Sequence, residues 1–226
     1  MGIGKKGFTL VEIIVSLAIM TIVAGAVGAF VIAGNNSYMR GNKELTLQEE
    51  AQLTANQMID LIIDVEKGIS FSNLTDQEAV DVDGNVAKDV NGMEVTNASV
   101  SELRLINNDN SYMIRWQGGA GADYADANQV YLYEVTNTKD GEGKVVVGDF
   151  DAAKPALMAE HVSSFSVDLS ELDKRKVVLN MIFTYQDKSY DISETIKLRN
   201  DLSSEPSSIY SWISGIRIIP EHADLK

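Results

Sequence analysis

The chain has 226 residues, which is enough for one sizeable core and an appended segment but not for two large domains. Its formal net charge of −14 repels phosphate backbones, so the folded body is not expected to bind nucleic acid. It contains no cysteine, which excludes disulfides, thiolate metal sites and a cysteine nucleophile.

The first predicted element is an apolar helix over residues 8–33, which contain a single charged residue, Glu12. With a rise of about 1.5 Å per residue, such a helix exceeds the roughly 30 Å hydrocarbon layer of a bilayer. Lys5 and Lys6 precede it, so the positive-inside rule predicts a cytoplasmic N-terminus and an acidic body outside the cytoplasmic membrane. A cleavable secretory signal would have a shorter apolar region, and a plain signal anchor leaves Glu12 unexplained.

The carboxylate of Glu12 needs a partner, because a charge near the centre of a membrane helix costs roughly 2.5 to 3.5 kcal/mol. In the uncut chain the candidate partners are Lys5 and Lys6. If the chain is cut after Gly7, the new α-amine of Phe8 lies one helical turn from Glu12, within the chain or on a neighbour. At about 4 Å and an effective dielectric constant of about 20, this pairing contributes about 4 kcal/mol before desolvation, which offsets the insertion cost.

The string from Lys5 to Glu12 reads KKGFTLVE and is followed by an unbroken apolar run. It resembles the prepilin cleavage and methylation motif of type IV pilins and type II secretion pseudopilins. The resemblance implies cleavage after Gly7 by a prepilin peptidase, N-methylation of Phe8, and pairing of Glu12 with a neighbouring N-terminus during assembly. It also implies other pilin or pseudopilin subunits and an inner-membrane assembly platform as partners.

The apolar helix departs from many members of that family, which carry a proline in its outer half. The first proline here is Pro155, and Gly25, Gly28 and Gly34 supply the helix-weakening positions instead.

A second, amphipathic helical segment is predicted over residues 35–69. Its apolar residues have the spacing of one helix face, and Gly68 is the expected stop. Asn35, Asn36 and Gly41 leave room for a kink between the two segments. The apolar positions on that face are Ala51, Ala55, Met58, Ile59, Ile62 and Ile69.

Residues 70–98 are rich in Asp, Asn and Gly and are predicted to form small strands and loops, with hairpin turns at Asp83-Gly84 and Asn91-Gly92. The acidic residues of this stretch superficially resemble a calcium loop. However, Gly92 stands where an EF-hand needs a bidentate glutamate, so solvated turns are favoured and no metal is expected.

The remaining strands are predicted from alternating apolar and polar residues. The first group covers 102–106, 112–117, 129–135 and 144–147, with the last two joined across a turn at 139–141. The second group covers 162–169, 177–185 and 190–198, with a turn at Asp187-Lys188. Together they predict an antiparallel sheet with one buried face resting on the helix from residue 51 onward.

The expected fold class is α+β, with a long N-terminal helix packed on an antiparallel β-sheet domain, which is the pilin fold that the resemblance implies. The expected segments are a leader (1–7), an apolar helix (8–34), an amphipathic helix (35–69), a β-rich domain (70–200) and a tail (201–226). The whole chain resembles, loosely, the larger minor pilins that include the PilW-like and GspJ-like proteins.

The tail carries an apolar patch after a Ser- and Pro-containing linker. This patch either docks on a partner subunit or folds back onto its own domain, and folding back is favoured. Its residues are Ile209, Tyr210, Trp212, Ile213, Ile216, Ile218 and Ile219.

No catalytic chemistry is expected. His161 and His222 have no metal-ligand spacing and no recognisable nucleophile nearby, and there is no phosphate-binding glycine loop. The sequence therefore predicts a non-enzymatic protein without cofactor. It would be a minor pilin or pseudopilin that helps to initiate or cap a filament, and the filament system (motility or adhesion, secretion, DNA uptake) is left open. The alternative is a permanently membrane-anchored extracellular adhesin or ligand-binding protein.

Overall fold

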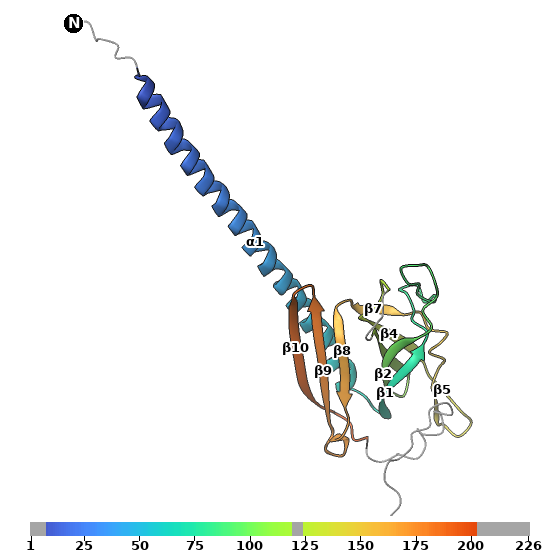
Figure 1. The fold of residues 1–226 in the computed structure, drawn as a ribbon. Helices are drawn as coiled ribbons and strands as arrows, with labels where there is room; N and C mark the ends of the chain where they lie inside the picture. The colour runs from blue at the N-terminus through green and yellow to red at the C-terminus, as the bar shows by residue number, and fades with distance from the viewer. Residues whose placement is uncertain (1–7, 119–123, 203–226) are drawn as a thin grey trace, which may run out of the picture. The chain divides into compact units, whose positions relative to one another are not determined.

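The computed structural model describes residues 8–118 and 124–202, which form a long helix and two main antiparallel sheets (Figure 1). Helix α1 spans Leu10–Ile63. The strands are β1 (Gly68–Gln77), β2 (Ala98–Ile106), β3 (Asn110–Gly118), β4 (Gln129–Thr136), β5 (Thr138–Lys139), β6 (Val145–Val146), β7 (Ala156–Ala159), β8 (Val162–Asp168), β9 (Lys176–Tyr185) and β10 (Lys188–Lys197), and a short 3-10 turn covers Leu172–Lys174. The α+β class is confirmed.

The chain divides into two compact units within α1, at residues 46 and 47. In the first unit, the described residues form the N-terminal part of the helix. The helix runs on through Asn35, Asn36 and Gly41, where a kink was expected. A Cβ atom added to any glycine of this part of the helix would meet no other atom, so close packing within the unit does not require glycine at these positions.

In the second unit, α1 contributes one buried face to the core. Of the positions predicted for this face, Ala51, Ala55, Met58 and Ile62 are buried, and Leu47 and Thr54 are buried with them. Ile59 is only partly buried, and Ile69 lies in β1 and not on the helix. The expected helix end at Gly68 is wrong, because α1 ends at Ile63 and Gly68 starts β1. The amide of Lys67 already donates to the carbonyl of Ile106 at 2.9 Å, so pairing with β2 replaces helical hydrogen bonding here.

The strands form two main sheets rather than the single expected one. Five strands have the order β1-β2-β3-β4-β7, and three have the order β10-β9-β8. The expected pairing of 129–135 with 144–147 is wrong, because both edges of β4 are occupied, by β3 and by β7. Strand β6 pairs instead with the short β5, across the predicted turn. The turn between β9 and β10 lies at Gln186-Asp187, one residue earlier than expected, since Tyr185 pairs with Lys188.

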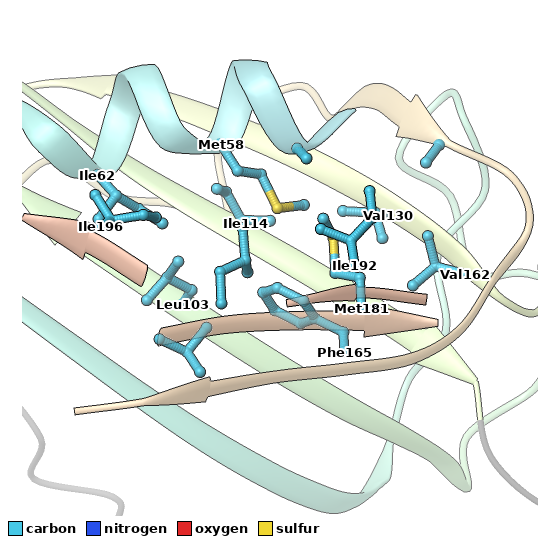
Figure 2. Packing of buried hydrophobic residues seen from close by; sticks show 14 of the residues in the cluster. Met58, Ile62, Leu103, Ile114, Val130, Val162, Phe165, Met181, Ile192 and Ile196 are labelled. Carbon is cyan, nitrogen blue, oxygen red and sulfur yellow. The ribbon is translucent and has the colours of Figure 1, made fainter. Parts of the chain in front are cut away.

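The core lies where α1 meets side chains of both main sheets (Figure 2). Met58 and Ile62 on the helix are fully buried, with Leu103 and Ile114 from one sheet and Met181 from the other in the same cluster. Burial of apolar side chains from all three elements stabilises the body, at roughly 1.5 to 3 kcal/mol for each large side chain.

An insert between β1 and β2 contains a repeat of eight residues that the turn dipeptides alone did not reveal. Ala79, Ala87 and Val95 are eight residues apart. The amide of Ala87 donates to the carbonyl of Ala79, that of Val95 to Ala87, and that of Ala79 to Val95, each at 2.9 Å. Three backbone hydrogen bonds therefore close a ring at the base of the two Asp-containing turns.

Candidate functional site

The sequence-predicted site residues fall at the start of the helix. Lys5, Lys6 and Gly7 lie outside the described residues, so cleavage after Gly7 and the role of the two lysines stay predictions. Phe8 and Glu12 are described, and both are exposed in the first unit. Phe8 precedes the first helical residue, Leu10, and Glu12 lies in the first turn.

Glu12 closes a reciprocal cap at the helix start. The amide of Glu12 donates to Oγ1 of Thr9 at 3.3 Å, and Oε2 of Glu12 accepts from the amide of Thr9 at 3.3 Å. This is the capping-box arrangement, in which a Ser or Thr and a Glu three residues later satisfy each other's backbone donors. Thr9 was not among the predicted site residues, although the T-x-x-E pattern is visible in the sequence.

The cap changes the electrostatic situation of Glu12. Its carboxylate lies at the positive end of the helix dipole, where a negative charge is stabilised by about 0.3 to 1 kcal/mol. It also has a hydrogen-bond donor in its own chain before any other subunit arrives. A positive group from another subunit therefore has to compete with the Thr9 amide for the carboxylate of Glu12.

Other polar side chains of the apolar segment are also satisfied internally. Ser16 Oγ donates to the carbonyl of Glu12 at 2.7 Å, and Thr21 Oγ1 donates to that of Ala18 at 2.8 Å. In hydrocarbon, where no water competes, a hydroxyl needs such a partner. These contacts make the segment compatible with a bilayer interior.

The apolar side chains of the first unit are exposed. None of its described residues is buried, and the first buried side chain along the helix is Leu47. By length and composition this helix can cross a membrane. The large exposed hydrophobic residues before the first glycine are Phe8, Leu10, Val11, Ile13, Ile14, Val15, Leu17, Ile19, Met20, Ile22 and Val23.

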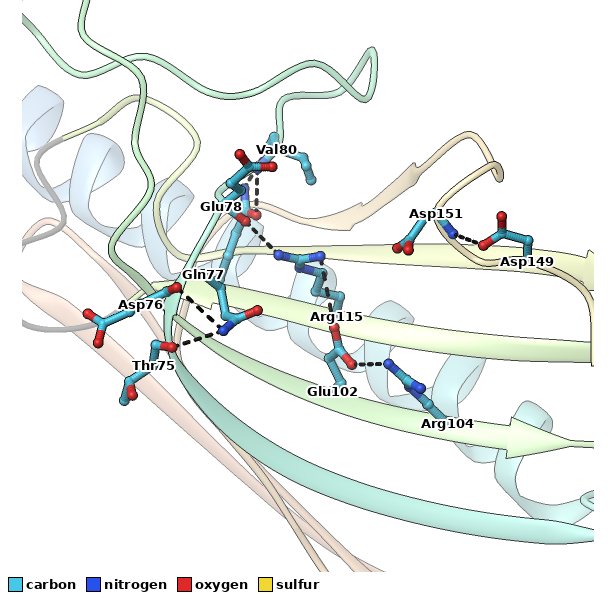
Figure 3. Close-up of polar contacts among 11 residues, drawn as sticks. Thr75, Asp76, Gln77, Glu78, Val80, Glu102, Arg104, Arg115, Asp149 and Asp151 are labelled. Atoms are coloured by element: carbon cyan, nitrogen blue, oxygen red, sulfur yellow. Dashed lines mark hydrogen bonds and ion pairs between the residues drawn. The ribbon is translucent and has the colours of Figure 1, made fainter. Parts of the chain in front are cut away.

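Strands β2 and β3 of the second unit carry a partly buried charge cluster around Glu102 (Figure 3). Glu102, 5% exposed, accepts from Arg104 at 2.7 Å and lies 3.9 Å from Arg115. Arg115 also donates to the carbonyl of Glu78 at 2.5 Å. A buried carboxylate needs such pairing, so the cluster anchors the insert to the sheet. Nothing in the alternating sequence pattern distinguishes it from ordinary surface charges.

The acidic turns use their carboxylates to bind backbone amides. Asp81 Oδ1 accepts from the amides of Asp83 and Asn85, both at 2.9 Å, and Asp89 Oδ1 does the same in the next turn. The hydrogen bond from the Asn85 amide is the main cause that lowers the pKa of Asp81. Within residues 8–118 and 124–202, no group of three or more His, Cys, Asp or Glu side chains is placed to hold a metal ion.

His161 has a structural contact. Its Nδ1 lies 2.6 Å from Glu50 Oε2, and Glu50 Oε1 accepts from the amides of Glu160 and His161 at 2.7 and 3.1 Å. This joins the buried part of α1 to the junction of β7 and β8. His222 lies outside the described residues.

Comparison with known proteins locates one match, and it falls on the helix start. Residues 4–28 match the family model described as the prokaryotic N-terminal methylation motif. No curated protein and no solved structure matches the chain.

Proposed function

We propose that the chain is a subunit of the type IV pilin and pseudopilin kind, and within that kind a minor subunit that helps to initiate or cap a filament after prepilin peptidase processing. The match of residues 4–28 to the N-terminal methylation motif supports this proposal. A subunit of this kind is structural and not an enzyme, and the proposal includes its processing by a prepilin peptidase and its assembly with other pilins. That the subunit is a minor one, and that it starts or caps the filament, goes beyond what the motif alone supports.

The observation that carries the proposal is the apolar helix surface that no residue of its own unit covers, with a single carboxylate at its start. An exposed apolar surface of this length is stable in a bilayer or against similar helices of other subunits. The helix is proposed to anchor the chain in the cytoplasmic membrane first, with the N-terminus in the cytoplasm. It then moves into the filament.

Processing would supply the positive partner of Glu12. Hydrolysis of the Gly7–Phe8 peptide bond leaves a carboxylate on the leader and a protonated α-amine on Phe8, and methylation of that amine keeps its charge. The amine of a neighbouring subunit then competes with the Thr9 amide for the Glu12 carboxylate. The amine brings a full positive charge, whose Coulomb attraction to the carboxylate the uncharged Thr9 amide lacks, so the exchange favours assembly.

The first test is mass spectrometry of the subunit purified from cells that contain an active prepilin peptidase. The expected mature chain begins at Phe8 and carries one added methyl group. Gly7→Val should abolish processing, whereas Gly4→Val, a matched change within the leader, should leave it intact. Recovery of the wild-type chain with its leader uncut would refute the proposal.

The second test separates assembly from anchoring. Glu12→Gln keeps the shape and the amide acceptor but removes the charge, so membrane insertion should persist while association with other pilins is lost. Equal association of Glu12→Gln and wild type with other pilins would show that the charge of Glu12 does not drive assembly. If neither chain associates with other pilins, the helix is only an anchor. The chain is then better described as an extracellular ligand-binding protein.

A further inference from the structure

Two basic residues follow the apolar part of α1 on its C-terminal side. Residues 13–39 contain no charged residue, and Arg40 and Lys43 are the first basic residues after them. Helix α1 continues without a break through this stretch, so these residues keep fixed positions along the helix. Arg40 is exposed, and Tyr38, close to it in the sequence, is 70% exposed. Residues 38–43, here called the basic collar, thus lie just beyond the segment that can cross a membrane.

The charge of the chain is divided unequally between its two units. Residues 1–46 contain four basic and two acidic residues, a net charge of +2. Residues 47–226 contain the remaining 15 basic and 31 acidic residues, a net charge of −16, and the two values add up to the −14 of the whole chain. The basic collar carries two of the four positive charges of the first unit. An anionic surface therefore attracts the first unit and repels the second.

The basic collar falls at the depth of the lipid headgroups when the helix spans a bilayer. With Glu12 at one face of the hydrocarbon layer, about 20 residues reach the other face near Ile32. At about 1.5 Å per residue, Tyr38 lies about 9 Å and Arg40 about 12 Å beyond that face. In an α-helix the Cα–Cβ bonds tilt toward the N-terminus, which here is the direction of the bilayer. The long side chains of Tyr38 and Arg40 can therefore reach back into the headgroup layer, as tyrosine and arginine at membrane interfaces do.

The nearest acidic residue competes only weakly with lipid for Arg40. Glu44 lies one helical turn after Arg40, on the side away from the bilayer. An exposed ion pair at this spacing, with the basic residue first, favours contact only about twofold. Each Lys or Arg near an anionic membrane surface favours binding roughly fivefold. The planar guanidinium of Arg40 also matches the geometry of phosphate oxygens, so an anionic headgroup is its preferred partner.

We propose that the basic collar binds anionic phospholipid headgroups in the outer leaflet of the cytoplasmic membrane and so sets the depth of the helix in the bilayer. The inference rests on the membrane-anchored stage of the proposed function and adds a lipid class to it. Cleavage after Gly7 removes Lys5 and Lys6, so Arg40 and Lys43 are the basic residues that remain in the first unit of the mature chain. The mature subunit then depends on the collar for its electrostatic contact with lipid.

Electron paramagnetic resonance of spin-labelled lipids, with the full chain reconstituted in vesicles, tests the lipid preference. The association of phosphatidylglycerol relative to phosphatidylcholine should fall roughly fivefold in Arg40→Gln at low salt, and Arg40→Lys should retain it. The matched control, Lys139→Gln in the second unit, removes the same charge and should equal the wild type. At about 1 M salt, where the screening length is about 3 Å, the wild-type preference should disappear. Equal preference in wild type and Arg40→Gln, or an equal loss in Lys139→Gln, would overturn the proposal.

The depth of the helix is measured in the same vesicles with nitroxide labels on introduced cysteines, because the chain has no natural cysteine. Gly41→Cys and Gly25→Cys are suitable, since both glycines have open space around them. The label at position 41 should become less accessible to a water-soluble relaxant when phosphatidylglycerol is added, and Arg40→Gln should abolish this change. The label at position 25, about 24 Å further into the bilayer, should stay shielded in all vesicles.

The two labels separate failure of this proposal from failure of the proposed function. A shielded label at position 25, with a label at position 41 that does not respond to lipid charge, would overturn the lipid contact and leave the membrane anchor intact. An exposed label at position 25 would refute both. If the label at position 41 becomes shielded only as the ratio of protein to lipid rises, the collar contacts another copy of the chain, and the lipid contact is again overturned.

Discussion

The part of α1 from Leu47 to Ile63 should stabilise the body through its buried face alone, and Met58→Ala tests this. Met58 is fully buried, and the cluster around it draws on α1 and both main sheets, which limits how far its surroundings can collapse. Truncation of such a methionine to alanine lowers the free energy of unfolding by about 2 to 5 kcal/mol. Because the surroundings of Met58 cannot fully collapse into the cavity, we expect a loss of about 3 kcal/mol. Leu53, on the same helix and 60% exposed, is the matched control, and Leu53→Ala should change stability by less than about 0.5 kcal/mol.

Urea unfolding in micelles, followed by the fluorescence of Trp116, measures the difference. Trp116 reports on the body because it contacts the core cluster and its Nε1 donates to the carbonyl of Val162 at 2.5 Å. Trp212→Phe removes the second tryptophan in all variants. With a slope of about 2 kcal/mol per molar urea, Met58→Ala should lower the midpoint by about 1.5 M. Equal urea midpoints for Met58→Ala and Leu53→Ala would refute the conclusion that the buried face of α1 stabilises the body.

Three further predictions concern single contacts. Gly148→Ala should lower the unfolding midpoint, because its Cβ would meet a backbone carbonyl oxygen at 2.7 Å, whereas Gly141→Ala, with open space around it, should not. In the insert, backbone hydrogen bonds lower the pKa of Asp81 in the folded chain, so the ionised carboxylate stabilises its turn at neutral pH, and this stabilisation is lost as the pH falls through that pKa. The NMR signals of the amides bound to Asp81 should therefore shift with a midpoint below 3.8. Asp81→Asn should abolish this titration. Thr9→Val should weaken the helix start by about 1 kcal/mol, seen as faster exchange of the Glu12 amide, while Thr9→Ser should match the wild type.

The strands with clear alternation could be predicted from the sequence to within a few residues. Strand β9, predicted as 177–185, spans Lys176–Tyr185, and β8, predicted as 162–169, spans Val162–Asp168. Most of strand β1 lies in the stretch predicted as small strands and loops, but its bounds could not be given because residues 70–77 are mostly polar and only partly buried, so no apolar period marks them. Its formation depends on pairing with β2, a tertiary contact that propensity does not contain.

The division into two sheets also depends on contacts far apart in the sequence. Alternation tells which face of a strand is buried but not which strand is its neighbour, so the position of β7 beside β4 could not be anticipated. At the helix start, Glu12 could be singled out because a carboxylate in an apolar run is costly. Its contact with Thr9 follows the T-x-x-E pattern of a capping box, which the sequence also contains.

The ring formed by Ala79, Ala87 and Val95 constrains how the insert can change over evolution. Two of its hydrogen bonds join residues eight positions apart, Ala79 with Ala87 and Ala87 with Val95, so the loss or gain of one residue in either segment would shift the amides away from their carbonyls. The tips of the turns take no part in closure, and Val82 and Val90 at these tips are exposed. The insert thus combines a base closed by backbone hydrogen bonds with tips that present exposed apolar side chains to solvent.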